Sequence, residues 1–286
     1  LARKWGKVKR DGAYEVIVAD GAFHGRTLGA LAATAMEKYR LPFTPLPEGF
    51  VRVPFNDLDA IKQATGPQTA AVLVEPIQGE GGVIVPDDDY LPGLRAWCDQ
   101  AGILLIFDEV QTGMGRCGAL FAHQLYGVKP DVMTLAKGLG GGFPVGAFVA
   151  QESASVFEPS EHASTFGGNP LACHVGHTVL KYMLDNDIPG QVARKGDFLR
   201  QRLYAMADRR PFIEEVRGRG LLWALQLKRE AAEEGVHLAL KEGLLINNVR
   251  PNALRLMPPL TVSEAELEQC LAILEPVIER LEKDGA

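Results

Sequence analysis

Residues 103–109, Ile-Leu-Leu-Ile-Phe-Asp-Glu, are the stretch of sequence that decides the fold. The five apolar residues do not alternate with polar ones, and the run is far shorter than the roughly 20 residues that a membrane helix needs. Such a run is typical of a strand that is buried on both faces of a parallel sheet. Asp108 would then end the most apolar strand of the chain, where a buried carboxylate requires a cation or strong hydrogen-bond donors. A helix cap or a salt bridge to an arginine would satisfy it equally well.

Similar short apolar runs alternate with helical patterns along the rest of the sequence. Strands are predicted at residues 15–19, 70–74, 132–135, 145–149 and 221–227, and helices at about 27–36, 90–100, 170–209 and 231–242. A closing helix is predicted after Ser263, which forms a capping box with Glu266. This alternation indicates βαβ units and therefore an α/β fold with a mostly parallel sheet between helices. We expect a large domain over residues 1–175 and a smaller α+β domain over 176–286.

Composition excludes several classes of protein. The 286 residues carry 30 Lys and Arg against 36 Asp and Glu, a net charge of −6, so we expect neither nucleic acid nor a membrane as a partner. The four cysteines form no CxxC pair and are expected to be free thiols in a reducing compartment, the cytoplasm. The sequence opens at Leu1 in a helix-like pattern, so we expect the natural N-terminus to lie further upstream.

Lys137 is the second residue that suggests chemistry. It follows the predicted strand 132–135, and four glycines follow it within five residues, at 138, 140, 141 and 142. Neither GxxxxGK[ST] nor GxGxxG occurs, which argues against a P-loop or a dinucleotide fingerprint. A lysine between a strand end and a glycine loop is suited to covalent chemistry with an aldehyde. A surface lysine beside a flexible turn is the alternative.

Three further segments carry polar residues at predicted strand or helix ends. GAFHGRT (21–27) offers Arg26 to a carboxylate, EPIQGEGG (75–82) carries Glu80 in a glycine-rich turn, and HASTFGGNP (162–170) has two hydroxyls where a helix begins. Structural ion pairs and a plain helix cap are the alternatives. RGRG (217–220) is interpreted as a turn before a strand. His174 and His177 lack further ligands at matching spacing, so no metal site is expected.

Six motifs together resemble the class III pyridoxal-phosphate-dependent aminotransferases, and most closely their acetylornithine/ornithine aminotransferase branch. They are FHGRT (23–27), EPIQGEGG (75–82), IFDEVQTG (106–113), AKGLGGGFP (136–144), STFGGNP (164–170) and LRLMPPL (254–260). The resemblance covers essentially the whole chain and implies the type I fold of pyridoxal-phosphate-dependent transferases. The family's N-terminal portion, including the segment that cups the cofactor phosphate, would precede Leu1.

The resemblance also implies roles at the cofactor, pyridoxal 5′-phosphate. Lys137 would form a Schiff base with it and later move a proton between the substrate carbon and the cofactor. Asp108 would pair with the pyridine nitrogen. The other residues expected at the cofactor are Phe23 and Val110 on the two ring faces, Gln111 at the phenolic oxygen, Glu109, and Thr165, which would bind the phosphate of the neighbouring subunit. A site shared in this way implies a homodimer.

The same resemblance implies a substrate site. Arg26 and Arg255 would hold substrate carboxylates, with Ser164 close by and Glu75 as support. Glu80 would mask Arg255 when an amino donor without a second carboxylate is bound, and would release it for 2-oxoglutarate. The expected reaction transfers the terminal amino group of N-acetylornithine to 2-oxoglutarate, giving N-acetylglutamate semialdehyde and glutamate, a step of arginine biosynthesis.

Several other functions remain open on the sequence. His24, where an aromatic residue could stand, favours acetylornithine over ornithine only modestly, and succinylornithine, succinyldiaminopimelate and 4-aminobutyrate are further candidate donors. An aminomutase or decarboxylase would not need Arg26, Glu80 and Arg255 together. A non-catalytic dimeric binding module would have no reason to keep Lys137 and Asp108, and a Rossmann-type nucleotide enzyme would need the missing glycine fingerprint.

Overall fold

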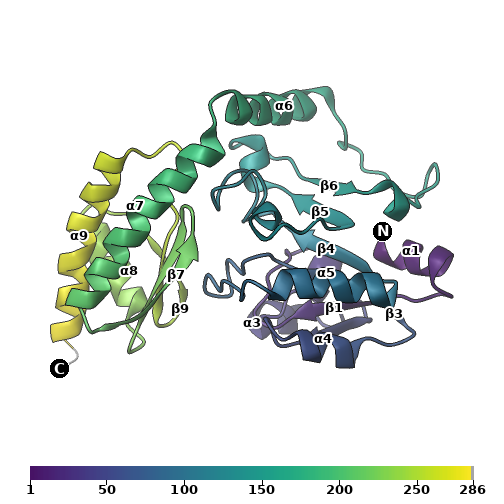
Figure 1. The fold of residues 1–286 in the computed structure, drawn as a ribbon, viewed down its shortest axis with the longest axis horizontal. Coiled ribbons are helices and arrows are strands. Elements are labelled where there is room, and N and C mark those ends of the chain that lie inside the picture. The colour runs from purple at the N-terminus through teal and green to yellow at the C-terminus, as the bar shows by residue number, and fades with distance from the viewer. Residues whose placement is uncertain (285–286) are drawn as a thin grey trace. The chain divides into compact units, whose positions relative to one another are not determined.

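The computed structural model describes residues 1–284, which divide into two compact units (Figure 1). The first unit comprises Leu1–Ile77, Pro86–Met114 and Phe121–Asp185, and the second comprises Gln78–Val85, Gly115–Leu120 and the chain from Asn186 onward. A single division at residue 175 was expected. Instead the chain contributes two short segments to the second unit before it leaves the first at Asp185.

The first unit is built on a mixed sheet with the strand order β2-β1-β3-β4-β5-β6. Neighbouring strands are parallel except for β5 and β6, which are antiparallel. The strands are β1 (Glu15–Ala19), β2 (Phe50–Val53), β3 (Thr69–Val74), β4 (Leu104–Asp108), β5 (Val132–Leu135) and β6 (Ala147–Ala150). The mostly parallel α/β sheet that the sequence predicted is therefore confirmed.

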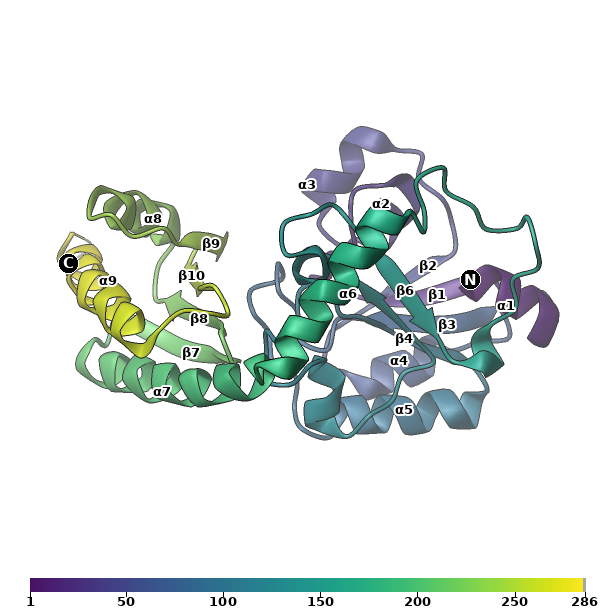
Figure 2. The same cartoon turned by 90° about the horizontal axis from the view of Figure 1, so that it is seen from above.

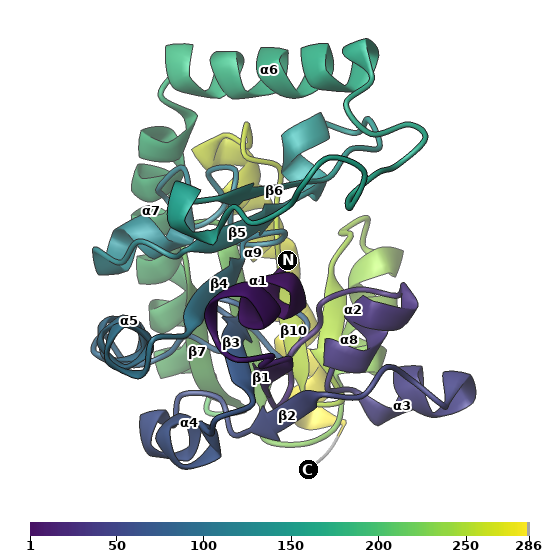
Figure 3. The same ribbon diagram turned by 90° about the vertical axis from the view of Figure 1, so that its right-hand side faces the viewer.

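Helices lie on both faces of this sheet, as Figures 2 and 3 show. The helices of this unit are α1 (Ala2–Lys9), α2 (Leu28–Ala33), α3 (Glu37–Arg40), α4 (Leu58–Ala64), α5 (Tyr90–Ala101) and α6 (Pro170–Asp185), with short 3-10 turns η1 (Leu41–Phe43), η2 (Ala122–Tyr126), η3 (Lys137–Gly140) and η4 (Glu152–Ala154). In β4, Leu105 and Phe107 pack in the core that α4 and α5 close, whereas Leu104 and Ile106 pack in the core on the opposite face. Because successive side chains of β4 enter the cores on opposite faces of the sheet, the strand is apolar throughout.

The second unit has an antiparallel sheet with the order β7-β8-β10-β9 and three helices beside it (Figure 1). Its elements are α7 (Ile188–Arg209), β7 (Ile213–Arg219), β8 (Leu222–Leu227), α8 (Ala232–Lys241), β9 (Asn247–Arg250), β10 (Ala253–Leu256) and α9 (Glu264–Lys283). The predicted capping box of Ser263 and Glu266 begins α9. The interpretation of residues 217–220 as a turn was wrong, because Arg217 and Arg219 lie within β7 and only the following Gly220 and Leu221 connect it to β8.

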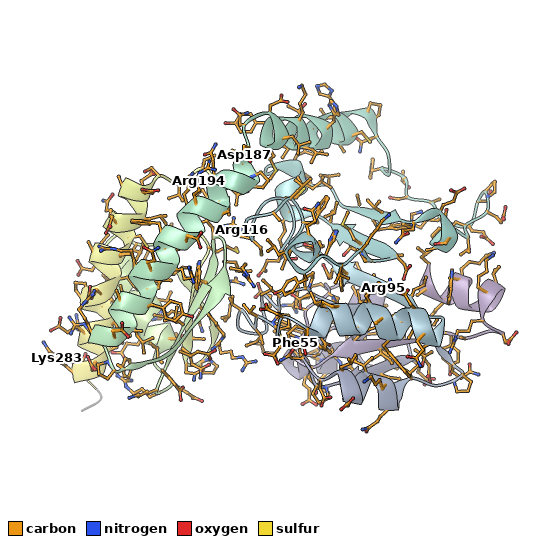
Figure 4. All side chains as sticks on the ribbon, in the orientation of Figure 1. Phe55, Arg95, Arg116, Asp187, Arg194 and Lys283 are labelled. Atoms are coloured by element: carbon orange, nitrogen blue, oxygen red, sulfur yellow. The ribbon has the colours of Figure 1, made fainter. Side chains whose placement is uncertain are left out.

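Local polar contacts fix the connections of the second unit (Figure 4). Asp187 caps α7 by accepting a hydrogen bond from the Gly190 amide, and its carboxylate lies 3.6 Å from Arg194. Arg116 donates to the carbonyls of Pro258 at 2.6 Å and Leu221 at 3.0 Å, which ties its segment to this unit. Burial lowers the pKa of Arg116 to about 10. Its guanidinium therefore remains charged near neutral pH.

Two further findings concern the described residues as a whole. None of the helices in residues 1–284 is long and apolar enough to cross a membrane. The four cysteines are free thiols, as the sequence predicted, with Cys98 and Cys117 buried.

Candidate functional site

The candidate site of the first unit lies at the carboxyl edge of its parallel strands. Because β1, β3, β4 and β5 run parallel, the residues that follow them meet at one edge of the sheet. The register places Val74 beside Phe107 and Asp108 beside Thr134. Glu75, Asp108 and Lys137 therefore leave the sheet at this same edge.

Asp108 is buried at this edge and is surrounded by hydrogen-bond donors. Its Oδ1 accepts from the Val110 amide at 3.0 Å and from the Thr134 hydroxyl at 3.2 Å. Its Oδ2 lies 2.8 Å from Nδ1 of His24. These donors satisfy the expectation that a carboxylate at the end of an apolar strand needs strong partners, and they fix its orientation.

His24 is a functional candidate whose contact with Asp108 sequence reasoning missed. Its side chain is 3% exposed, and its Nε2 is buried without a hydrogen-bond partner among the described residues. Burial alone would lower the pKa of His24, but the hydrogen bond to Asp108 and the charges of Asp108 and Glu75 outweigh it and raise the pKa. The imidazole therefore favours its protonated form beside Asp108. The only sequence signal was its position in the GAFHGRT segment (21–27), which follows β1.

Phe23, Arg26 and Glu75 also gather near this edge. The Phe23 amide donates to Oε2 of Glu75 at 3.1 Å, which links the loop after β1 to the end of β3. The exposed guanidinium of Arg26 lies 3.6 Å from the ring centre of Tyr39 and 5.6 Å from that of Phe23. Tyr39, which the sequence did not single out, packs edge-on against Phe23 at 6.0 Å. The arginine is thus held by two aromatic rings.

Lys137 follows β5 and opens the 3-10 turn η3. Its φ is +45°, a left-handed conformation that is uncommon for residues other than glycine. Gly141, with a φ of +54°, closes the same turn. Strained backbone of this kind is concentrated at functional sites, so the conformation supports Lys137 as a candidate.

The residues after Asp108 divide into two groups. Glu109 is 1% exposed and accepts hydrogen bonds from Thr112, from the Ala122 amide and from both the amide and Nδ1 of His123. The structure thus gives its carboxylate a role in holding the loop before η2, and its expected contact with a cofactor stays a prediction. Val110 and Gln111 are half-buried, and their expected contacts also stay predictions.

Ser164 and Thr165 lie on an exposed loop of the first unit before α6. Asn169 caps that helix through a hydrogen bond from the Ala172 amide to its side chain, at 2.9 Å, and Pro170 occupies the first turn. The helix therefore begins where the sequence predicted. The expected contacts of the two hydroxyls stay predictions.

The second unit contains the remaining predicted pair. Oε1 of Glu80 lies 2.7 Å from Nη1 of Arg255, and the Arg255 side chain is only 6% exposed. Nε of Arg255 also donates to Asn247 at 3.2 Å. Arg255 belongs to β10 and Glu80 to the 78–85 segment, so a sheet strand and a turn bring the pair together. In residues 1–284, no group of three His, Cys, Asp or Glu side chains is arranged to hold a metal ion.

The chain is similar to known aminotransferases over almost its whole length. Residues 1–278 match the family model described as aminotransferase class III. The chain is 47% identical to the acetylornithine aminotransferase of Caldanaerobacter subterraneus subsp. tengcongensis, over 98% of this chain and 72% of that protein. It is 46% identical to the acetylornithine aminotransferase of Gloeobacter violaceus, over 98% of this chain and 71% of that protein.

A solved structure agrees with these similarities. The crystal structure of ornithine aminotransferase from Toxoplasma gondii ME49 superposes with a TM-score of 0.94 at 33% identity, and covers 99% of this chain and 69% of that one. The match confirms the expected transaminase fold. Family model, relatives and fold agree with the six motifs, and the chain belongs to the class III aminotransferase family and is an aminotransferase enzyme.

Proposed function

We propose that the chain is an acetylornithine aminotransferase that uses pyridoxal 5′-phosphate. It would transfer the terminal amino group of N-acetylornithine to 2-oxoglutarate, yielding N-acetylglutamate semialdehyde and glutamate, a step of arginine biosynthesis. The observation that carries the proposal is the placement of Asp108, held by three donors, and of Lys137 at one edge of the parallel sheet.

The residues at this edge fit the proposed cofactor chemically. A buried carboxylate suits a protonated pyridine nitrogen, and the contact with His24 keeps Asp108 oriented at the edge of the sheet. A lysine amine suits the cofactor's aldehyde. Phe23 and Val110 offer apolar surface to its ring, and Glu109 and Gln111 flank Val110 in the sequence. Thr165 offers a hydroxyl to the cofactor phosphate of a neighbouring subunit. When bound, the cofactor supplies an electron sink for the carbon that loses a proton.

The chain's own residues would then bind the substrate and move the proton. Nζ of Lys137 would move a proton between the cofactor and the carbon that bears the transferred amino group, in opposite directions in the two half-reactions. Arg26, held by Phe23 and Tyr39, binds a substrate carboxylate as a planar fork, with Ser164 and Glu75 in support. In the second unit, Arg255 binds the second carboxylate of 2-oxoglutarate, and Glu80 neutralises Arg255 when the donor has none.

Similarity supports N-acetylornithine as the amino donor. Two relatives that bear the name acetylornithine aminotransferase are 47% and 46% identical to the chain, whereas the ornithine aminotransferase of Toxoplasma gondii ME49 is 33% identical. Ornithine, succinylornithine and 4-aminobutyrate are the competing donors.

A homodimer and a cytoplasmic location complete the proposal. Large apolar side chains are exposed on one stretch of the first unit that also contains Ser164 and Thr165; they are Phe148, Val149, Phe166, Leu171 and Tyr182. Exposed apolar groups of this size suit burial against a second copy of the chain. The free cysteines suit the reducing cytoplasm.

The test is a steady-state assay of the full chain with pyridoxal phosphate and 2-oxoglutarate. Each candidate donor is supplied in turn, and glutamate formation is measured, with Lys137→Ala as the inactive control. We expect the highest kcat/KM with N-acetylornithine. A higher kcat/KM with ornithine or 4-aminobutyrate would contradict the donor, and equal glutamate formation by Lys137→Ala would contradict the mechanism.

A further inference from the structure

The turn that carries Glu80 has an unusual backbone. Gln78 and Ile84 close it through reciprocal hydrogen bonds, from the Gln78 amide at 3.0 Å and from the Ile84 amide at 2.9 Å. Within it, Gly82 has a φ of +118° and the buried Val83 a φ of +54°. A β-branched residue in the left-handed region is a strained outlier that persists only where its surroundings hold it. The turn therefore needs support from outside its own hydrogen bonds.

Two arginines from the antiparallel sheet supply this support. Nε of Arg217, on β7, donates to the Gly82 carbonyl at 2.9 Å, and Nε of Arg250, at the end of β9, donates to the Gly81 carbonyl at 2.6 Å. These are the carbonyls of the two residues directly after Glu80. A Cβ added to Gly82 would lie 2.8 Å from Nε of Arg250, so only glycine admits the arginines this closely.

The guanidinium groups of Arg217 and Arg250 lie close enough for their positive charges to repel each other. Arg217 is buried and uses its Nη1 to bind Glu215 and Gln226. Partial burial and the positive charge of Arg217 lower the pKa of Arg250. Two neighbouring cations repel each other, so this arrangement costs free energy that the contacts with the turn must offset.

The position of Glu80 depends on this turn more than on its own side chain. The Glu80 side chain is 34% exposed, so burial does not fix its position. A small movement of the backbone would separate it from Arg255, which is almost fully buried. The rigidity of the 78–84 turn then determines how often Glu80 is paired with Arg255.

We propose that Arg217 and Arg250 are positioning residues that hold the 78–84 turn so that Glu80 covers Arg255, and that they thereby set the discrimination between monocarboxylate amino donors and dicarboxylate acceptors. The inference rests on the proposed function of Glu80 and Arg255. With the turn loosened, Arg255 is uncovered in more of the molecules. Dicarboxylates then bind more readily, and a donor with one carboxylate leaves a buried cation unpaired.

Arg250→Met is the most informative variant, because Arg250 lies at the end of β9 outside the buried core, so its loss leaves the core untouched. The two half-reactions of the holoenzyme are measured separately by rapid mixing, with N-acetylornithine and with 2-oxoglutarate, together with the dissociation constant of glutarate. We expect the ratio of kcat/KM for the donor to that for 2-oxoglutarate to fall about tenfold, the worth of one charged hydrogen bond, and glutarate to bind more tightly. Arg250→Lys, which keeps the charge, should restore part of the ratio.

Matched controls separate this inference from the function on which it rests. Arg209→Met removes an exposed arginine of the same unit that pairs with Glu275 instead, and it should leave the ratio unchanged. Glu80→Gln should lower the ratio by itself, and Arg250→Met should add nothing in that background. An unchanged ratio in Glu80→Gln would overturn the proposed switch. A lowered ratio in Glu80→Gln with an unchanged ratio in Arg250→Met would overturn the role of the arginines alone.

Discussion

The carboxylate of Asp108 accepts hydrogen bonds from a backbone amide, a hydroxyl and an imidazole, and the three donors come from different parts of the chain. Val110 is two residues away, Thr134 lies on the neighbouring strand, and His24 follows β1, which β3 separates from β4. The first two partners follow from local sequence and strand pairing. The third depends on the order of strands in the sheet, which is why sequence reasoning missed it.

The raised pKa of His24 predicts how stability depends on pH. A folded-state pKa above the ordinary 6.5 means that the folded chain binds this proton more tightly than the unfolded chain does. The contribution of His24 is therefore fully present below pH 6.5 and is lost as the pH rises through the raised pKa. We expect the difference in the free energy of unfolding between the wild type and His24→Gln, measured with denaturant and without cofactor, to shrink over that range. Parallel pH profiles would refute the coupling, and the exposed His174→Gln serves as the control.

At the scale of elements, the sequence predicted those strands and helices that are marked by a continuous apolar run or by a capping residue. The apolar run of β4 and the capping box of α9 were read directly, because each depends only on neighbouring residues. Strand β2 was missed because it is four residues long and contains Arg52, whose Nη2 donates to the Ala32 carbonyl. The pairing of Arg217 and Arg250 with the 78–84 turn was missed because those segments are more than a hundred residues apart in sequence.

The loop between β4 and η2 depends on Glu109 for its stability. Its buried carboxylate accepts from Thr112 at 2.6 Å, from the Ala122 amide at 3.0 Å and from the His123 amide at 2.8 Å. Glu109→Ala leaves these buried donors without an acceptor, so we expect the free energy of unfolding to fall by about 3 kcal/mol. Glu109→Gln keeps one acceptor oxygen and should lose less. Denaturant unfolding measures both, and a loss below about 1 kcal/mol in Glu109→Ala would show that water replaces the carboxylate.

At the scale of the whole molecule, the proposed homodimer predicts that two impaired variants restore activity when they are mixed. If Thr165 serves the site of its neighbour, then a dimer of Thr165→Ala and Lys137→Ala chains contains one site with both defects and one with neither. We expect each variant alone to be impaired and their mixture to recover activity, up to the share of hybrid dimers. No recovery, with subunit exchange verified by mass spectrometry of differently tagged chains, would mean that Thr165 serves its own site.

The most direct measurement of the central claim is borohydride reduction of the full chain with pyridoxal phosphate bound, followed by peptide mass mapping. Reduction makes the bond between the cofactor and its lysine permanent, so the labelled peptide identifies the residue. We predict a single pyridoxyl label, on the peptide that contains Lys137, and its loss in Lys137→Ala. No label, or labels spread over several surface lysines, would contradict the assignment of Lys137 and Asp108 as the cofactor site and would favour a binding module that keeps only the fold.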